Sequence, residues 1–216
     1  KMKSAQASGR GEEKRIGKDQ RTTGQYRMSH QGKLIVFTAP SGSGKTTIVK
    51  HILKTFPETA FSVSGTTRKR RPHEVHGIDY YYLSVETFKL WIENDAFGEW
   101  EEVYPGQFYG TLRSEISRLH QMGKHVVFDV DVKGALSIKR NYPVDTLTVF
   151  LKVPSMEVLE QRLRARGTET EENLQKRLEK AKEELTYESQ FDMVLINDVL
   201  EDTLCQAEDI VRNFLL

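Results

Sequence analysis

The stretch APSGSGKT, residues 39–46, decides the fold of this chain. It follows an apolar run at residues 34–38 and opens a stretch of helical character at residues 44–56, which is the setting of a phosphate-binding loop. Small residues let the backbone wrap around an anion with its N–H groups pointing inward, and the helix start adds a favourable dipole. We expect Lys45 to neutralise β- and γ-phosphate oxygens and Thr46 to offer its hydroxyl group to Mg²⁺.

This loop predicts a site for a nucleoside triphosphate, but it does not distinguish a kinase from a GTPase or an ATPase. The alternative interpretation is a turn that merely caps a helix. The usual first glycine is replaced by Ala39, and since alanine tolerates a left-handed backbone poorly, we expect ordinary dihedral angles there. The residues predicted to hold the triphosphate are Ala39, Pro40, Ser41, Gly42, Ser43, Gly44, Lys45, Thr46 and Thr47.

Strand-like and helix-like stretches alternate along the rest of the chain. Ser84 is expected to cap a helix that runs to about residue 94, and Gly123 to end another. The further predicted strands are residues 125–130, 147–153 and 193–196, and the further predicted helices are residues 111–122, 155–166, 171–188 and 201–214. Such alternation implies an α/β fold with a mostly parallel central sheet covered by helices on both faces.

Charge is distributed unevenly along the chain. Residues 1–31 hold eight Lys or Arg and three Asp or Glu with little apolar periodicity, so we interpret them as a disordered tail or a non-native leader before Met28. The net charge is +1, which leaves a mildly acidic body and argues against nucleic-acid binding. No apolar run approaches the roughly 20 residues of a membrane span. The single cysteine, Cys205, excludes an internal disulfide framework, and a cytoplasmic location is expected.

A second motif, SVSGTTRKRRPHEVHGIDYYY from residue 62 to residue 82, contains candidates for an acceptor site. Arg68 and Arg71 are three residues apart and could clamp a monophosphate, to which Tyr80 could donate a hydrogen bond. Ser64 and Glu74 belong to the same candidate site. The alternative is that the basic run at residues 68–71 is a solvated charge cluster or a localisation signal.

Carboxylates provide the candidates for base recognition. Guanine presents two adjacent donors, N1–H and the 2-amino group, and the carboxylate of Glu99 could accept from both, whereas adenine would leave it poorly paired. Asp129 and Asp131 follow the apolar run at residues 126–128, where ligands of α/β sheets bind. Asp129 fits the organisation of Mg²⁺, and Asp131 could reach a base or a ribose; the alternative for Asp131 is helix capping.

Taken together, these motifs point to one protein family. Apart from the first motif, none of them would be specific enough on its own. Residues 32–216 resemble the guanylate kinases, nucleoside monophosphate kinases that phosphorylate GMP with ATP, in the motifs APSGSGKTT, FGEWEEVYPGQFYGT, VVFDVDVKGA and RLRARGTETEENLQKRL as well as the motif at residue 62. The resemblance implies a three-layer P-loop kinase fold. Ala39 stands where Gly is commoner, and Thr111 where Ser is common.

The resemblance also implies residue roles. For GMP it implies that Ser64, Arg68, Arg71, Tyr80 and Tyr109 hold the phosphate and that Glu99, Thr111 and Asp131 read the guanine. It assigns Arg162, Arg166 and Arg177 to a lid over the transferring phosphoryl group, and it places Asn197 and Asp198 near the adenine of ATP. The alternative for the lid arginines is ordinary ion pairing with Glu171, Glu172 and Glu179.

A core of about residues 32–63, 113–153 and 189–216 is expected, with a GMP-binding insert at about 64–112 and a lid at about 154–188. The expected reaction gives GDP and ADP with Mg²⁺ as cofactor, from GMP and also dGMP, in a monomer or homodimer. Two rivals remain: a catalytically inactive scaffold domain that binds peptides, and an enzyme with another acceptor.

Overall fold

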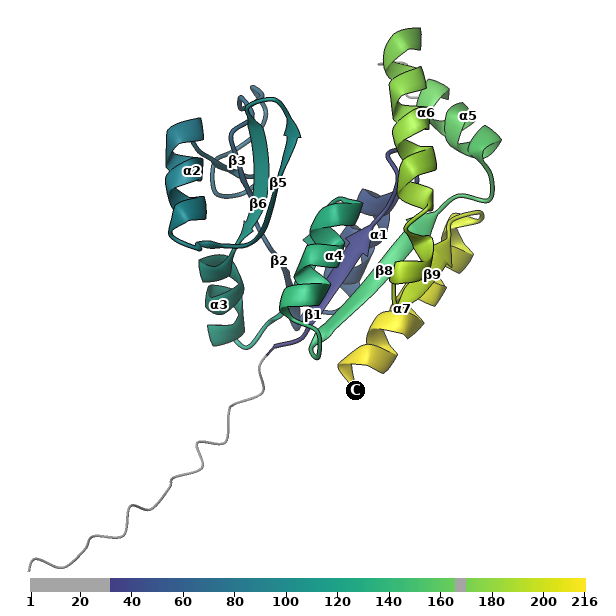
Figure 1. The fold of residues 1–216 in the computed structure, drawn as a ribbon. Helices are drawn as coiled ribbons and strands as arrows, with labels where there is room; N and C mark the ends of the chain where they lie inside the picture. Colours follow the sequence, from purple (N-terminus) through teal and green to yellow (C-terminus); the bar gives the residue numbers. More distant parts are fainter. Residues whose placement is uncertain (1–31, 166–169) are drawn as a thin grey trace, which may run out of the picture. The chain divides into compact units, whose positions relative to one another are not determined.

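The computed structural model describes residues 32–165 and 170–216 (Figure 1). Its main sheet has five parallel strands in the order β2-β7-β1-β8-β9. The bounds of these strands are β1 Leu34–Thr38, β2 Thr59–Phe61, β7 His125–Asp129, β8 Thr146–Lys152 and β9 Met193–Ile196. The phosphate-loop strand β1 lies at the centre, with β7 and β8 as its neighbours, so the loop emerges beside the ends of two other strands.

Helices cover both faces of this sheet because the buried central strand alternates its side chains between them. Ile35 and Phe37 pack with helices α1 and α7, whereas Leu34 and Val36 pack with α3 and α4. The bounds are α1 Lys45–Thr55, α3 Arg113–Gln121, α4 Val132–Asn141 and α7 Leu200–Leu215. The expected layered α/β fold with a mostly parallel sheet is therefore confirmed.

A second sheet, in the order β4-β3-β6-β5, has a core of its own with helix α2. Phe88 stacks on Phe97 with ring centroids 4.3 Å apart, and Ser84 caps α2 by accepting from Thr87 N at 3.1 Å. The elements are β3 Gly65–Thr66, β4 Tyr81–Tyr82, α2 Val85–Glu93, β5 Phe97–Tyr104 and β6 Gln107–Leu112. The pair β5–β6 is antiparallel and turns at Pro105 and Gly106.

Helices α5, Met156–Ala165, and α6, Glu171–Leu185, form a hairpin with a third apolar core. Leu159 and Leu163 of α5 pack against Leu174, Leu178 and Ala181 of α6. A short 3₁₀ helix, Glu188–Gln190, follows before β9. No helix within the described ranges is long and apolar enough to span a membrane.

Two predicted helix boundaries were wrong. Thr111 and Leu112 end strand β6 instead of beginning a helix, because they pair with Glu99 and Phe97 of β5. Helix α6 ends at Leu185, three residues before the predicted end. Gly123 does follow a helix end, with φ +71°, as expected.

Candidate functional site

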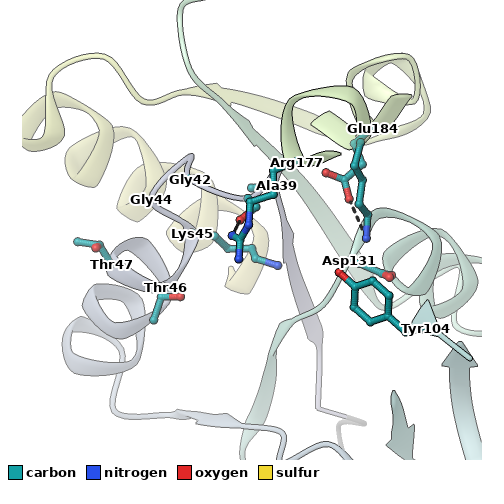
Figure 2. Close-up of a pocket in the computed structure, with 12 residues that line it drawn as sticks. Ala39, Gly42, Gly44, Lys45, Thr46, Thr47, Tyr104, Asp131, Arg177 and Glu184 are labelled. Carbon is teal, nitrogen blue, oxygen red and sulfur yellow. Dashed lines mark hydrogen bonds and ion pairs between the residues drawn. The ribbon is translucent and has the colours of Figure 1, made fainter. Parts of the chain in front are cut away.

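The loop between β1 and α1 borders a cavity of about 390 Å³ (Figure 2). Gly42 and Gly44 adopt φ angles of +100° and +92°, which L side chains rarely adopt, and Gly44 caps α1. Ala39 is absent from the positive-φ residues of the described chain, as expected. The lining includes Ala39, Ser41, Gly42, Gly44, Lys45, Thr46 and Thr47. A backbone cradle at a helix start, with a lysine at its base, is suited to bind phosphates.

Lys45 and Thr46 both meet Asp129 at the end of β7. Lys45 Nζ lies 2.7 Å from Asp129 Oδ1 and donates to the Val130 carbonyl oxygen at 2.6 Å. Thr46 Oγ1 donates to Asp129 Oδ2 at 3.4 Å. A hydroxyl and a carboxylate beside a phosphate cradle are the hard oxygen ligands that Mg²⁺ takes together with nucleotide phosphates. The described residues contain no cluster of three His, Cys, Asp or Glu side chains able to hold a metal on its own.

Asn197 supports the loop from behind. Its side-chain amide is buried and donates to the Ser43 carbonyl oxygen at 2.8 Å. A Cβ atom at Gly44 would lie 2.5 Å from Asn197 Nδ2, so this contact requires glycine. Asp198 meets the site through its backbone, because Arg162 Nη2 approaches the Asp198 carbonyl oxygen at 3.4 Å. Neither residue lines the phosphate cavity.

Arg68 is fixed by Glu74. Arg68 Nη2 donates to Glu74 Oε1 at 2.7 Å, while the Arg71 backbone N–H and the Tyr82 hydroxyl each donate to Glu74 Oε2 at 2.8 Å. These bonds, the Arg68 bond first, lower the pKa of Glu74 to about 2, and the carboxylate in turn holds the pKa of Arg68 above its usual range. The geometry makes Glu74 a residue that orients Arg68.

Aromatic side chains surround this arginine. The Arg68 guanidinium lies 5.5 Å from the ring centroid of Tyr80, and Tyr80 meets Tyr109 edge-on at 6.0 Å. Tyr80, Tyr109 and Ser64 line a second cavity of about 270 Å³. The Arg71 side chain is 64% exposed, and its Nη1 lies 3.9 Å from Glu74 Oε1.

The lining of this second cavity also contains carboxylates, among them Glu99 and Asp131. Glu99 is buried, and the Thr111 hydroxyl donates to its Oε1 at 2.7 Å. Burial raises the pKa of Glu99 to about 7, and the nearby Asp131 charge adds to this effect. Asp131 caps α4, since its Oδ1 accepts from Gly134 N at 2.8 Å, as the alternative interpretation expected, and it also lines the cavity.

The helical hairpin contributes arginines from above the loop. Arg177 Nη1 donates to Ser41 Oγ at 2.7 Å and lines the phosphate cavity. Arg164, to which no lid role was assigned, forms a two-bond ion pair with Glu171. Arg166 lies outside the described residues, as do residues 1–31, for which a disordered tail or a leader was expected.

Sequence reasoning missed several residues of the site, among them Glu184, which lines the loop cavity. Tyr82 bonds Glu74, and Tyr104, Glu101 and Lys180 line one or both cavities. The alternation of β5 could have indicated Glu101, because it follows Glu99 by two residues and shares its face. Lys180 carries no such signal, since it belongs to a run of charged residues on a polar helix.

Comparison with known proteins gives one answer. A family model described as guanylate kinase matches residues 31–214. Guanylate kinase of Bacteroides thetaiotaomicron is 44% identical over 184 residues, which are 85% of this chain and 90% of the relative. That of Salinibacter ruber is 46% identical over 182 residues, 84% and 96% respectively. A crystal structure of guanylate kinase from Anaplasma phagocytophilum has a TM-score of 0.69 and 28% identity, and the match covers 86% of this chain and 87% of that one.

Proposed function

Because the chain belongs to the guanylate kinase family and is therefore a nucleoside monophosphate kinase that transfers a phosphoryl group from ATP to GMP, we propose how its residues divide that work. The observation that supports the division is that the two cavities share lining residues. Lys45 and Asp131 line both the loop cavity and the cavity of Glu99. Two nucleotides in these cavities would meet end to end at Lys45.

The cavity of Glu99 takes GMP. Glu99, oriented by Thr111, accepts from N1–H and the 2-amino group of guanine, and Asp131 completes the recognition of the base. At the other end Arg68, Arg71, Tyr80, Tyr109 and Ser64 hold the phosphate, and Glu74 keeps Arg68 in place. Adenine lacks both donors, so it would leave the buried carboxylate poorly paired. The acceptors are GMP and, next in preference, dGMP.

The loop cavity takes ATP. The loop N–H groups and Lys45 bind the phosphates of ATP. Asn197 supports the loop, and Asp198 lies beside Asn197 towards the adenine. Thr46 and Asp129 would hold Mg²⁺, which supplies positive charge to the phosphate oxygens when bound. Lys45 and Thr46 both contact Asp129.

The reaction needs no strong general base, because a GMP phosphate oxygen is itself the nucleophile. It attacks the γ-phosphorus while the bond from the γ-phosphorus to the bridging oxygen breaks, and ADP leaves. Lys45, Arg68 and the lid arginines Arg162, Arg166 and Arg177 reduce the repulsion between the facing anions. Closure of the insert, about residues 64–112, and of the lid, about 154–188, over the core excludes water that would hydrolyse ATP.

The wider role follows from this chemistry. GDP is the precursor of GTP, so we place the enzyme in purine nucleotide metabolism and GMP recycling, in the cytoplasm, as a monomer or homodimer without nucleic-acid or membrane partners.

An acceptor screen tests the proposal. ADP release from ATP is measured with GMP, dGMP, AMP, UMP and dTMP at equal concentrations. We expect GMP to be turned over fastest and dGMP next. Faster turnover of another nucleotide would contradict the assignment of Glu99, and no turnover with any of them, alongside tight peptide binding, would favour the scaffold function.

A further inference from the structure

Lys180 occupies an unusual place between the two cavities. It lies on α6, one helical turn after Arg177, and it shares with Lys45 and Asp131 the property of lining both cavities. Lys45 and Asp131 belong to the core of the protein, on α1 and before α4. Of these three residues, Lys180 is the one that comes from the helical hairpin.

Three carboxylates line one cavity with Lys180 and interact with its charge. Nζ lies 3.7 Å from Glu184 Oε1 on the next turn of α6, and its charge acts on Glu101 and Asp131 across the cavity. Figure 2 shows Glu184 facing the side of the cavity where Asp131 and Tyr104 lie. Acidic groups from α6, β5 and the start of α4 thus converge on one lysine.

Glu101 and Asp131 line the same cavity, and their carboxyl groups interact electrostatically. Glu101 Oε2 is buried without a hydrogen-bond partner among the described residues. Burial and this neighbour raise the pKa of Glu101 to about 8. A second cation, Lys133, approaches Glu101 Oε1 at 3.7 Å. Such a crowded carboxyl pair is stabilised by a nearby positive charge.

We propose that Lys180 is a positioning residue that ties α6 to the wall of the GMP cavity through Asp131 and Glu101 and so holds Arg177 above the phosphate loop. The proposal rests on the assignment of the Glu99 cavity to GMP. GMP in that cavity would displace water around the Lys180 contacts, and a lower local dielectric strengthens ion pairs. GMP binding and the position of α6 that holds Arg177 above the phosphate loop therefore favour each other.

This arrangement couples the two substrates. Arg177 lines the ATP cavity, so a closed α6 also favours ATP phosphates, and GMP should tighten binding of an ATP analogue by the same factor as the analogue tightens GMP. An exposed pair of charges contributes little by itself. Here Lys180 acts on a group of three carboxylates. GMP binding lowers the dielectric around these charges, and this change couples GMP binding to ATP binding.

Calorimetry tests this with the whole chain, GMP and the non-hydrolysable analogue β,γ-imido-ATP at constant Mg²⁺. We expect GMP to lower the Kd of the analogue at least five-fold in the parent protein, and less than two-fold in Lys180→Met. Lys180→Arg should restore most of the coupling. Lys182→Met, an exposed lysine two residues further along α6, is the matched control and should behave like the parent.

A double-mutant cycle identifies the partner. Lys180→Met should have a smaller effect on the coupling in a Glu101→Gln background than in the parent, because the two side chains act through the same contact. Equal coupling in Lys180→Met and Lys182→Met would overturn the proposal, as would a parent protein without coupling. A parent protein that does not bind GMP would contradict the assignment of the GMP cavity itself.

Discussion

Glu99 and Thr111 face each other across the antiparallel pair β5–β6, and the Thr111 hydroxyl donates to Glu99 Oε1 at 2.7 Å. The threonine is fully buried and the glutamate is 8% exposed. The protonation state of this buried carboxyl group therefore affects both GMP binding and the stability of the fold.

Substitution Glu99→Gln is expected to lower kcat/KM for GMP about 100-fold, because the amide cannot accept from both guanine donors and presents a donor of its own. Binding of ATP should be unchanged. Steady-state kinetics with GMP and calorimetry with β,γ-imido-ATP provide the measurement. Glu93→Gln, an exposed change on α2 of the same insert, is the control, and an unaltered GMP rate in Glu99→Gln would contradict the assignment.

The stability of the nucleotide-free protein should depend on pH through Glu99. Its pKa is raised from 4.5 to about 7 in the folded chain, so between these values the folded state holds a proton that the unfolded state has released. The free energy of unfolding therefore contains a component that is complete below pH 4.5 and is lost as the pH rises through 7, at most about 3 kcal/mol.

Urea titrations at pH 5 and pH 8 measure this component. In Glu99→Gln it is absent, so stability should fall less between the two pH values in the variant than in the parent. The same pH dependence in both proteins would show that Glu99 does not titrate in this range.

Lys45→Met should lower turnover with every acceptor about 1,000-fold, because Lys45 acts on the phosphates and not on the base. The control is Lys50→Met on the exposed side of the same helix. An acceptor screen with both variants distinguishes this effect from that of Glu99→Gln, which should be confined to guanine nucleotides. Selective loss of GMP turnover in Lys45→Met would be inconsistent with the proposed division of roles.

Glu74→Gln should raise KM for GMP about ten-fold and leave KM for ATP unchanged, since it weakens the bonds that hold Arg68 and the backbone of Arg71. Tyr82→Phe removes one of the three bonds to Glu74, so a smaller rise is expected. Initial rates at varied GMP and fixed ATP give both constants. A larger effect of Tyr82→Phe than of Glu74→Gln would contradict this order.

Gly44→Ala should destabilise the protein more than Gly123→Ala. Both glycines have positive φ angles, +92° and +71°, so each alanine is strained by about 1 kcal/mol. A Cβ atom at Gly44 would also lie 2.5 Å from Asn197 Nδ2, whereas one at Gly123 meets nothing within 4 Å. Urea unfolding of the two variants measures the difference. Equal decreases in the free energy of unfolding would show that the Asn197 side chain can shift without destabilising the protein.

Strand pairing explains why the helix predicted from residue 111 begins later than expected. The stretch after Gly110 has helical character, but Thr111 and Leu112 remain in β6 because strand pairing with β5 satisfies their backbone groups. The arginines of the hairpin show the same dependence. Arg164 pairs with Glu171, whereas Arg177 reaches Ser41, 136 residues away in the chain, and spacing on a helix does not reveal which partner each one finds.

Local sequence was sufficient for the phosphate loop, the strand before it and the cap at Ser84, because their conformations depend on glycine φ angles, apolar runs and hydrogen bonds between near neighbours. Assembly of the site required the folded chain. Lys45 came to meet Asp129, and Lys180 came to line one cavity with Asp131 and Glu101, although these residues belong to different elements. Charge and burial at such points depend on which segments the sheet order brings together, and no short stretch of residues contains that information.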